Sequence, residues 1–430
     1  MKPRAGGRSL TPKDALFLIF ALYAAAHFLT MRLYWDVAQS PIRGSDFSSY
    51  YTAGLLVREG RAASLYAVAA GDTILGDATS GAWAEAGASR GISRQHYYIY
   101  PPLFAVAAVP LTYLAFPAAL DLWLALDLVL LVGFFLLYAR SRAGEIQGVE
   151  IAMMVFVALF EFLPLIWALA VGQTSLIVLV LLTGSLLLWK RGADAGAGVL
   201  VGLATAIKLT PALLIVFFWW RGRRKIAIVS AITFVALQLL SIAALGWDLH
   251  RTFYLEIVPA MAGGTCYFLN QSLGALFNRM LTDGDVRNVA LVSSLAARVL
   301  SGAAALALLA WSAPRLRAGS PGTPLGDDLQ FGAVVLLTLI VSPISWSHHY
   351  LVALLPIVSL AGALGRGPKF SLTAAAALAL GCLLISRKPH PDLFVTGPAR
   401  LFNSAALAGA LILLGLSLHL LRGRGAEAAR

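Results

Sequence analysis

The chain has 430 residues, of which 59% are hydrophobic and only 13% are charged. A soluble domain carries about 25% charged residues, so this composition excludes an ordinary soluble domain and indicates a polytopic membrane protein. The net charge of +12 does not indicate nucleic acid binding, because the basic residues cluster in short loops between apolar segments. Two distant cysteines, Cys266 and Cys382, match no metal spacing and predict no disulfide.

Basic clusters predict which loops face the cytoplasm, by the positive-inside rule. They are the N-terminal arm, Arg140/Arg142, Lys190/Arg191, Arg221/Arg223/Arg224/Lys225, Arg315/Arg317, Arg366/Lys369 and Arg422/Arg424. With all of them inside, the apolar runs give an all-α bundle of roughly 11–13 membrane helices within a single domain, 1–430. Both termini are then cytoplasmic. The first run, 15–33, is expected to be a retained signal-anchor.

The first half of the chain is expected to combine one long outer loop with broken helices. The loop, 35–98, should hold short amphipathic helices. The segment 101–139 must return to the cytoplasm with an odd number of crossings. It holds two apolar helices, so one of them is expected to be short or re-entrant. Helices over 149–163 and 175–189 leave Gly172-Gln173-Thr174 outside. The stretch 196–220 is too short for two full spans at ~1.5 Å per residue, which predicts a broken hairpin with its apex at 208–211 and a cavity around it.

The second half is expected to alternate plain helices with two polar outer segments. Helices are predicted over 226–245, 289–311, 331–341, 351–364, 372–385 and 401–421. The outer segments are 246–287, which carries Asn270-Gln271-Ser272, and 342–350, which carries His348-His349.

Asp46 and Lys208 are the charged residues with the clearest functional interpretation. Asp46 follows the first apolar run and precedes Tyr50 and Tyr51; it is either a helix cap or a catalytic acid, and the two roles can coexist. Lys208 lies between Ile207 and Leu209 in a membrane segment, where an ionisable group is costly and is a functional candidate. It either neutralises a nearby acid or binds a phosphate.

Other polar residues on the same predicted side suit substrate recognition. His348 and His349 suggest hydrogen bonds to a phosphate or sugar; they lack an acidic motif with metal-ligand spacing, so no metal is expected. Tyr100 belongs to an aromatic–proline helix entrance that suits either an interfacial belt or sugar stacking. The amides of Gln173, Asn270 and Gln271 are either helix caps or contacts to sugar hydroxyls.

The order of these motifs resembles glycosyltransferase family 87. The resemblance is carried by Asp46-Phe-Ser-Ser-Tyr50-Tyr51, Tyr100-Pro-Pro, Gly172-Gln173, Ala206-Ile-Lys208-Leu-Thr-Pro211, Asn270-Gln271-Ser272 and Ser342-Pro-Ile-Ser-Trp346-Ser-His348-His349. It implies a GT-C-type membrane bundle with a long first extracytoplasmic loop, a polyprenyl-phosphate sugar donor, and mannose as the sugar. It also implies an acidic base in the first outer loop, a position that matches Asp46. The segment 67–91 and the tail after 372 match nothing diagnostic.

The resemblance and the residues together predict an inverting membrane hexosyltransferase without metal or cofactor. Asp46 would act as general base. Lys208, His348 and His349 would stabilise the leaving phosphate, and Tyr50, Tyr51, Tyr100, Gln173, Asn270 and Gln271 would position the sugars. The acceptor would be a glycolipid or glycan at the extracytoplasmic face of the inner (plasma) membrane. The alternatives are a transporter or flippase for a lipid-linked sugar or organic anion, and a non-catalytic assembly protein.

Overall fold

The computed structural model describes residues 43–141, 148–318, 324–365, 371–387 and 391–428. Within these ranges the chain forms helices, joined by loops with two isolated β-bridges, Asp77–His96 and Asn270–Trp346. The prediction of an all-α polytopic membrane protein is confirmed. The expected signal-anchor at 15–33 lies outside the described residues.

Five helices in the described part of the chain are long and apolar enough to cross a membrane, or six if one bent pair counts as a span. They are α6 (Phe116–Ser141), α12 (Arg224–Leu245), Leu295–Arg317 of α16 (Leu295–Ala318), Ser347–Gly365, and Gly397–Arg422, which includes most of α20 (Ala405–Ala428). Their exposed side chains are largely Leu, Val and Ile, which suits contact with lipid. The total of 11–13 helices stays a prediction.

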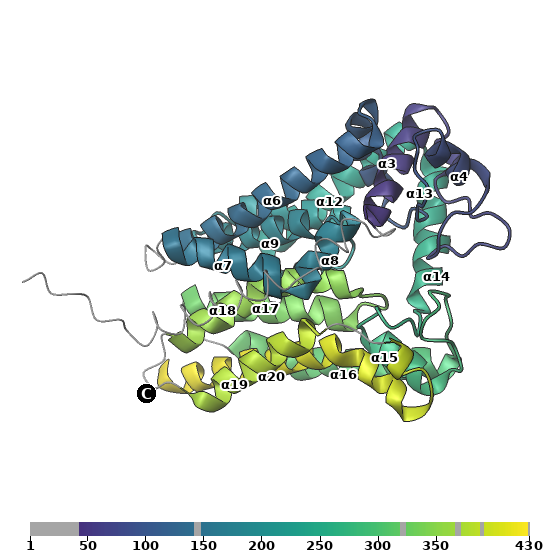
Figure 1. Cartoon of the computed structure of the whole chain (residues 1–430). Helices are drawn as coiled ribbons and strands as arrows, with labels where there is room; N and C mark the ends of the chain where they lie inside the picture. Colours follow the sequence, from purple (N-terminus) through teal and green to yellow (C-terminus); the bar gives the residue numbers. More distant parts are fainter. Residues whose placement is uncertain (1–42, 142–147, 319–323, 366–370, 388–390, 429–430) are drawn as a thin grey trace, which may run out of the picture.

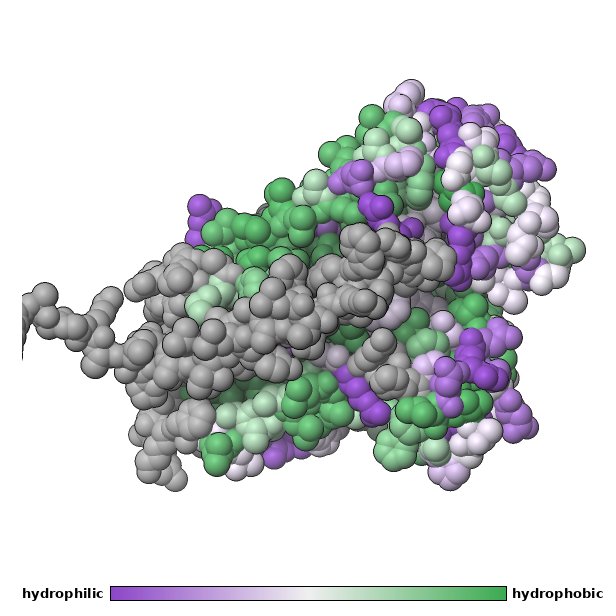
Figure 2. Space-filling view, viewed as in Figure 1, coloured by the Kyte–Doolittle hydropathy of each residue, from purple (hydrophilic) through white to green (hydrophobic). Residues whose placement is uncertain are grey.

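Short elements gather at one end of the long helices (Figure 1). The predicted outer loop contains α3 (Ser45–Arg58), η1 (Ala62–Ser64) and α4 (Gly81–Ala88), and the chain continues through α5 (Pro102–Ala108) and η2 (Val109–Tyr113). The expected short helix before the long α6 is therefore present as α5 and η2. Hydrophilic residues concentrate at the end that carries α3 and α4, whereas the coloured surface of the long helices to its left is mostly hydrophobic (Figure 2).

Two helical segments are broken close to the functional motifs. Helices α7 (Gly148–Glu161) and α8 (Leu163–Val171) meet at 73°. Helix α8 was not predicted, because the helices expected from the sequence end at 163 and resume at 175. Helices α10 (Asp194–Ile207) and α11 (Ala212–Trp220) are separated at 208–211, so the predicted break is confirmed. Pro211 lacks a backbone N–H and cannot continue the ladder of α10.

Helix α10 is held against α12 by close backbone contact. A Cβ added at Gly198 would lie 2.7 Å from the Ile226 carbonyl oxygen, and one at Gly202 would lie 2.7 Å from the Ser230 carbonyl oxygen. Glycines spaced four apart let two membrane helices approach at backbone distance. This contact fixes the C-terminal end of α10, where Lys208 begins the break.

The remaining elements complete the bundle. They are α9 (Ser175–Lys190), α13 (Trp247–Thr252), η3 (Phe253–Ile257), α14 (Val258–Ala262), α15 (Leu273–Leu281), α17 (Pro324–Val341), η4 (Ser347–Ala353), α18 (Leu354–Gly365), α19 (Leu372–Ile385), η5 (Pro391–Leu393) and η6 (Gly397–Ser404). Helix α17 begins seven residues before its predicted start at Phe331, because ion pairs hold its first turns. Lys190 pairs with Asp328 at 2.6 Å and Arg221 with Asp327 at 3.6 Å.

Candidate active site

Asp46 lies in the first turn of α3, which begins at Ser45 after Gly44. The N-cap position of α3 is occupied by Gly44, and Asp46 lies inside the helix, so the interpretation of Asp46 as an N-cap is wrong. The positive end of the helix still favours its charge. The backbone N–H of Gly44 donates to the Ala170 carbonyl oxygen at 2.8 Å, which ties the start of α3 to the end of α8.

Gln173 follows the end of α8 and faces Asp46. Gly172 makes the turn at φ 70°, and a Cβ there would lie 2.7 Å from Cβ of Phe47, so the turn requires glycine. The Gln173 Nε2 donates to Asp46 Oδ2 at 2.6 Å. Its Oε1 lies 2.8 Å from the Tyr50 hydroxyl and 2.9 Å from the Tyr100 hydroxyl. Because these donors occupy the amide oxygen, the amide nitrogen is the atom turned toward Asp46.

The predicted tyrosines divide into two groups. Tyr50 and Tyr100 are buried and hydrogen-bond each other at 2.9 Å between hydroxyl oxygens. Tyr50 therefore acts on the site through Gln173, whereas Tyr100 also lines the two cavities described below. Tyr51 points the other way, packs against Phe116 and donates to the Leu114 carbonyl oxygen at 2.7 Å. Its predicted contact with a sugar stays a prediction, and in this structure the side chain braces α3.

His348, in η4, also reaches Asp46. Its Nε2 lies 3.5 Å from Asp46 Oδ2 and 3.2 Å from Gln173 Nε2. An amide nitrogen can only donate, so the contact with Gln173 requires an unprotonated Nε2 on His348. The two N–H groups of the Gln173 amide thus serve Asp46 and His348, and they fix both side chains relative to one another.

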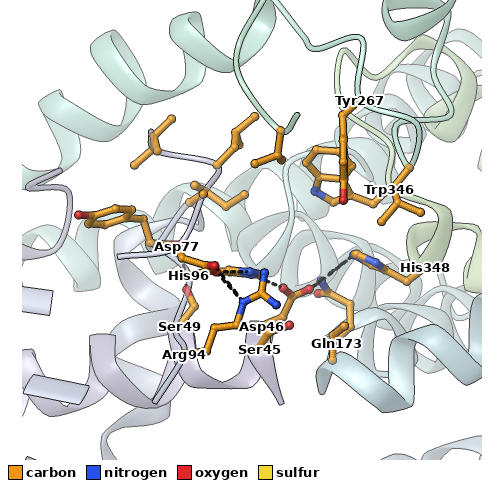
Figure 3. A pocket seen from close by; sticks show the side chains of 18 of the residues that line it. Ser45, Asp46, Ser49, Asp77, Arg94, His96, Gln173, Tyr267, Trp346 and His348 are labelled. Carbon is orange, nitrogen blue, oxygen red and sulfur yellow. Dashed lines mark hydrogen bonds and ion pairs between the residues drawn. The ribbon is translucent and has the colours of Figure 1, made fainter. Parts of the chain in front are cut away.

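His96 contacts the second oxygen of Asp46 and was not among the predicted site residues. Its Nδ1 lies 3.1 Å from Asp46 Oδ1, and its Nε2 lies 3.1 Å from Asp77 Oδ1. Arg94 completes the row, with its Nε 2.9 Å from Asp77 Oδ2. Asp77 and His96 are also joined by a backbone bridge. Figure 3 shows Arg94, Asp77 and His96 on one side of Asp46, with Gln173 and His348 on its other side.

The row of charges determines the ionisation of its members. Burial disfavours the charged form of Asp46, but the hydrogen bond to His96 and nearby positive charge outweigh burial, and its pKa is lowered. Burial lowers the pKa of His96, yet the hydrogen bonds to Asp46 and Asp77 raise it to about 9 overall. The hydrogen bond from His96 lowers the pKa of Asp77 to about 2. Near neutral pH the row is an alternation of anions and cations.

Asp46 borders a cavity of about 190 Å³, which we call the polar cavity because charged side chains lie in its lining, although apolar side chains supply more of its surface. The lining includes Asp46, Asp77, Arg94, His96, Gln173 and His348, with Tyr267 and Trp346 on the facing wall (Figure 3). The segment 74–77, in the stretch that matched no family motif, forms part of the rim. This polar cavity can admit a polar molecule to the carboxylate.

A second, mostly apolar cavity of about 240 Å³ contains Lys208 and His349. It shares Ile99, Tyr100 and Trp346 with the polar cavity, so these residues form the partition between the two. Among the described residues, Lys208 Nζ and His349 Nε2 are buried and have no hydrogen-bond partner. Lys208 Nζ lies 5.8 Å from the ring centre of Tyr100. The adjacent histidines therefore serve different cavities, and the apolar cavity offers two unused polar groups.

Asn270 and Gln271 line neither cavity. Asn270 donates to the Thr265 and Pro343 carbonyl oxygens and accepts from the Ser345 N–H. Gln271 donates to the Phe268 and Asn403 carbonyl oxygens and accepts from the Ala406 N–H. The Asn270 amide therefore holds the loop before η4 in place, and the Gln271 amide ties its own loop to the start of α20. The predicted contact of these side chains with a sugar stays a prediction.

The described residues include no group of three or more His, Cys, Asp and Glu side chains arranged to hold a metal ion. Cys266 and Cys382 are both free, as predicted. The apolar cavity has two nitrogen groups, Lys208 and His349, but no carboxylate in its lining. Such a set suits an anion better than a cation.

Comparison with known proteins gives one family and several relatives. The model of glycosyltransferase family 87 matches residues 98–343. A polyprenol-phosphate-mannose-dependent alpha-(1-2)-phosphatidylinositol mannoside mannosyltransferase of Mycolicibacterium smegmatis is 29% identical over 66% of this chain and 66% of its own length. A protein of the same description from Mycobacterium tuberculosis is 29% identical over 62% of each chain. A polyprenol-phosphate-mannose-dependent alpha-(1-2)-phosphatidylinositol pentamannoside mannosyltransferase of Mycolicibacterium smegmatis is 30% identical over 67% of this chain.

These matches define what the resemblance covers. The chain spans just under two thirds of the length of the first two relatives. The family match includes Tyr100, Gln173 and Lys208, but it begins after Asp46 and ends before His348. The family match therefore says nothing about Asp46 and His348, and their place in the site rests on the geometry.

Proposed function

Because this chain belongs to glycosyltransferase family 87, we propose that it is a membrane mannosyltransferase that uses a polyprenyl-phosphate sugar. The acceptor is a hydroxyl of a glycolipid, with phosphatidylinositol mannosides suggested by the relatives' names. One observation carries the proposal: a polar cavity with a carboxylate and an apolar cavity with an unpaired lysine share a thin wall of Ile99, Tyr100 and Trp346.

The apolar cavity is the proposed site of the donor. A buried ammonium group without a partner is costly, and a phosphate at Lys208 Nζ would remove that cost. His349 Nε2 adds a second polar atom in the same cavity. The surrounding apolar side chains suit the lipid chain of a polyprenyl phosphate. The proposal requires no metal, because these two side chains can stabilise the charge of a monophosphate.

The polar cavity is the proposed site of the acceptor. Asp46 removes the proton from an acceptor hydroxyl as its oxygen attacks the anomeric carbon. The bond between that carbon and the phosphate oxygen breaks, and its electron pair leaves on the polyprenyl phosphate. The proton remains on Asp46 until it passes to water. Attack opposite the leaving group inverts the configuration at the anomeric carbon.

His348 and Gln173 lie between the two proposed substrates. From the sequence, His348 is predicted to bind the donor phosphate together with His349. Its contact with Gln173 and its place in the lining of the polar cavity support a role nearer the acceptor and the base. Asn270 and Gln271 support the wall indirectly, through the loop that carries Trp346.

We further propose that the polar cavity opens on the extracytoplasmic side of the inner membrane, with both termini in the cytoplasm. The basic cluster residues Lys190 and Arg221 pair with Asp328 and Asp327, and Arg221 also lies 3.5 Å from the Arg317 carbonyl oxygen. These contacts bring the basic ends of α9, α11 and α16 together. The positive-inside rule assigns such an end to the cytoplasm.

Transfer by the purified protein in lipid vesicles tests the proposal. Vesicles receive radiolabelled polyprenyl-phosphate mannose with phosphatidylinositol mannosides or without acceptor. We expect label to enter the acceptor and an equal amount of unlabelled polyprenyl phosphate to form, only when both substrates are present. Movement of intact donor across the bilayer without new product would instead support the flippase alternative and contradict the proposal.

A further inference from the structure

His96 has a carboxylate at each end of its ring. The distances from Nδ1 to Asp46 Oδ1 and from Nε2 to Asp77 Oδ1 are both 3.1 Å. A neutral imidazole has one N–H, so one ring nitrogen would direct a lone pair at a carboxylate oxygen. An imidazolium donates from both nitrogens. The geometry therefore requires the charged form of His96 if both contacts are hydrogen bonds.

Asp77 and Arg94, on the side of His96 away from Asp46, stabilise the positive charge of the ring. Asp77 faces one ring nitrogen, and its other oxygen is bound by Arg94 Nε at 2.9 Å. Arg94 thus holds the carboxylate of Asp77 in place at the ring. Hydrogen bonds between ionised groups, such as those of Asp77 with Arg94 and His96, are shorter and stronger than neutral ones. The backbone bridge between Asp77 and His96 fixes the same pair a second time.

We propose that His96 is a positioning residue that remains protonated through the reaction cycle, orients Asp46 and keeps it ionised, while Asp77 and Arg94 hold His96 in place. This inference rests on the proposed function, because it assigns Asp46 as the base. No role is proposed for His96 as a proton acceptor. Its ring already carries both protons, so the proton of the acceptor hydroxyl stays on Asp46 and leaves through the open cavity.

Several groups from other elements also face Asp46, and they define what His96 adds. They are Gln173 after α8, His348 in η4 and Lys208 after α10, with the Tyr50 and Tyr100 hydroxyls behind Gln173. Gln173 is neutral, and Nε2 of His348 accepts from it. Lys208 has no hydrogen bond to Asp46 among the described residues. His96 is therefore the positive group in direct contact with Asp46.

The pH profile of transfer gives a sharp test. In the wild type, activity is lost as the pH falls through the lowered pKa of Asp46. In His96→Gln an amide N–H can still contact Asp46, but the positive charge in direct contact is gone, so less opposes the effect of burial on the pKa of the carboxyl. An adjacent opposite charge changes a carboxyl pKa by about 1–3 units. We expect the acid limb of kcat to move upward by about that amount.

Asp77→Asn tests the outer half of the row. Loss of this carboxylate lowers the pKa of His96 from about 9, so transfer should weaken at a lower alkaline pH than in the wild type. Glu85→Gln is the matched control, since Glu85 lies in α4 of the same loop and, among the residues that the structure describes, its carboxylate pairs only with Arg61, at 3.5 Å. Its profile should match the wild type. A reduced kcat in His96→Gln with an unmoved acid limb would overturn the proposal.

A second measurement does not depend on transferase activity. The seven histidines are labelled with ¹⁵N in the full chain, and the His96 signal is assigned by its loss in His96→Gln. We expect its titration midpoint near 9 and a clear fall in Asp77→Asn. A midpoint at or below the ordinary value of about 6.5 would refute the charged row even if transfer occurs. A midpoint near 9 in a protein without transfer would refute only the proposed function.

Discussion

At Lys208 a charged side chain ends inside the apolar cavity, and its Nζ has no hydrogen-bond partner among the described residues. A buried charge is normally paired, so this position favours the binding of an anionic group of a substrate. Asp46 is also near enough to influence the charge of Lys208 but makes no bond to it. The position suits the phosphate of a donor that arrives through the apolar cavity.

Removal of this charge tests the donor site. Lys208→Met keeps the length of the side chain and removes the ammonium group. Loss of a group that stabilises developing charge costs about 10²–10³-fold, so kcat/KM for the polyprenyl-phosphate sugar should fall by about that factor. Lys225 is exposed, so Lys225→Met is the control, and its kcat/KM should be near that of the wild type. Activity of Lys208→Met within about threefold of the control would exclude the phosphate role.

Single site residues were predictable from the sequence where a charged group lies in an apolar segment, or where the residue belongs to a known family motif. Lys208 was identified by its apolar neighbours, and Asp46 by its place after the first apolar run. His96 and Asp77 were missed because nothing in the loop marks a pair 19 residues apart; their partnership arises from a backbone bridge. Asn270 and Gln271 were predicted to contact a sugar because amides suit sugar hydroxyls. In the structure their amides are hydrogen-bonded to backbone groups instead.

At the scale of elements, the glycines of α10 determine where Lys208 lies. At Gly202 a Cβ would lie 2.6 Å from Cβ of Thr233 and 2.7 Å from the Ser230 carbonyl oxygen. Neither atom can move without displacing α12. The helix pair therefore positions the break at 208–211 against the apolar cavity.

Gly202→Val is expected to separate α10 from α12 and to displace Lys208. Overpacking of this kind costs about 1–3 kcal/mol, so the melting temperature in detergent should fall by several degrees and transfer should drop with it. Gly302→Val in α16 is the control, because no atom lies within 4 Å of a Cβ there. Equal melting temperatures and activities for the two variants would contradict this role of Gly202.

Element boundaries were predictable where hydrophobicity and proline agreed, as at the break between α10 and α11. They were not predictable where local sequence is uniform. Helix α8 continues the apolar character of α7 after a 73° bend, and composition alone cannot reveal a change of direction. The early start of α17 depends on the ion pairs of Asp327 with Arg221 and of Asp328 with Lys190, whose partners are far apart in the sequence.

For the whole molecule, the two ends of the bundle have opposite character. The end with α3 and α4 is polar and open at Asp46, and the other end is basic with buried ion pairs. The sequence predicted this polarity from the basic loops. It did not predict the division of the site into two cavities, because that division depends on Tyr100 and Trp346, 246 residues apart in the chain, lining the same two cavities.

Cysteine labelling tests the orientation. Ala70→Cys places a thiol on the exposed outer loop, and Arg191→Cys places one at the exposed end after α9. In intact cells a membrane-impermeant maleimide should label Ala70→Cys and spare Arg191→Cys until the cells are opened. The unaltered chain, with Cys266 buried and Cys382 partly buried, sets the background. The reverse pattern would place the polar cavity in the cytoplasm.

Transfer by Asp46→Asn is the most direct test of the whole account, with turnover measured under saturating donor and acceptor. Asparagine keeps the shape of the side chain but cannot accept the proton, so turnover should fall by about 10²–10⁴-fold. Asp121→Asn is the control, since Asp121 is 67% exposed and pairs only with Arg43 in the described structure, and it should retain wild-type turnover. Near-normal turnover in a folded Asp46→Asn protein would contradict the assignment of Asp46 as the base.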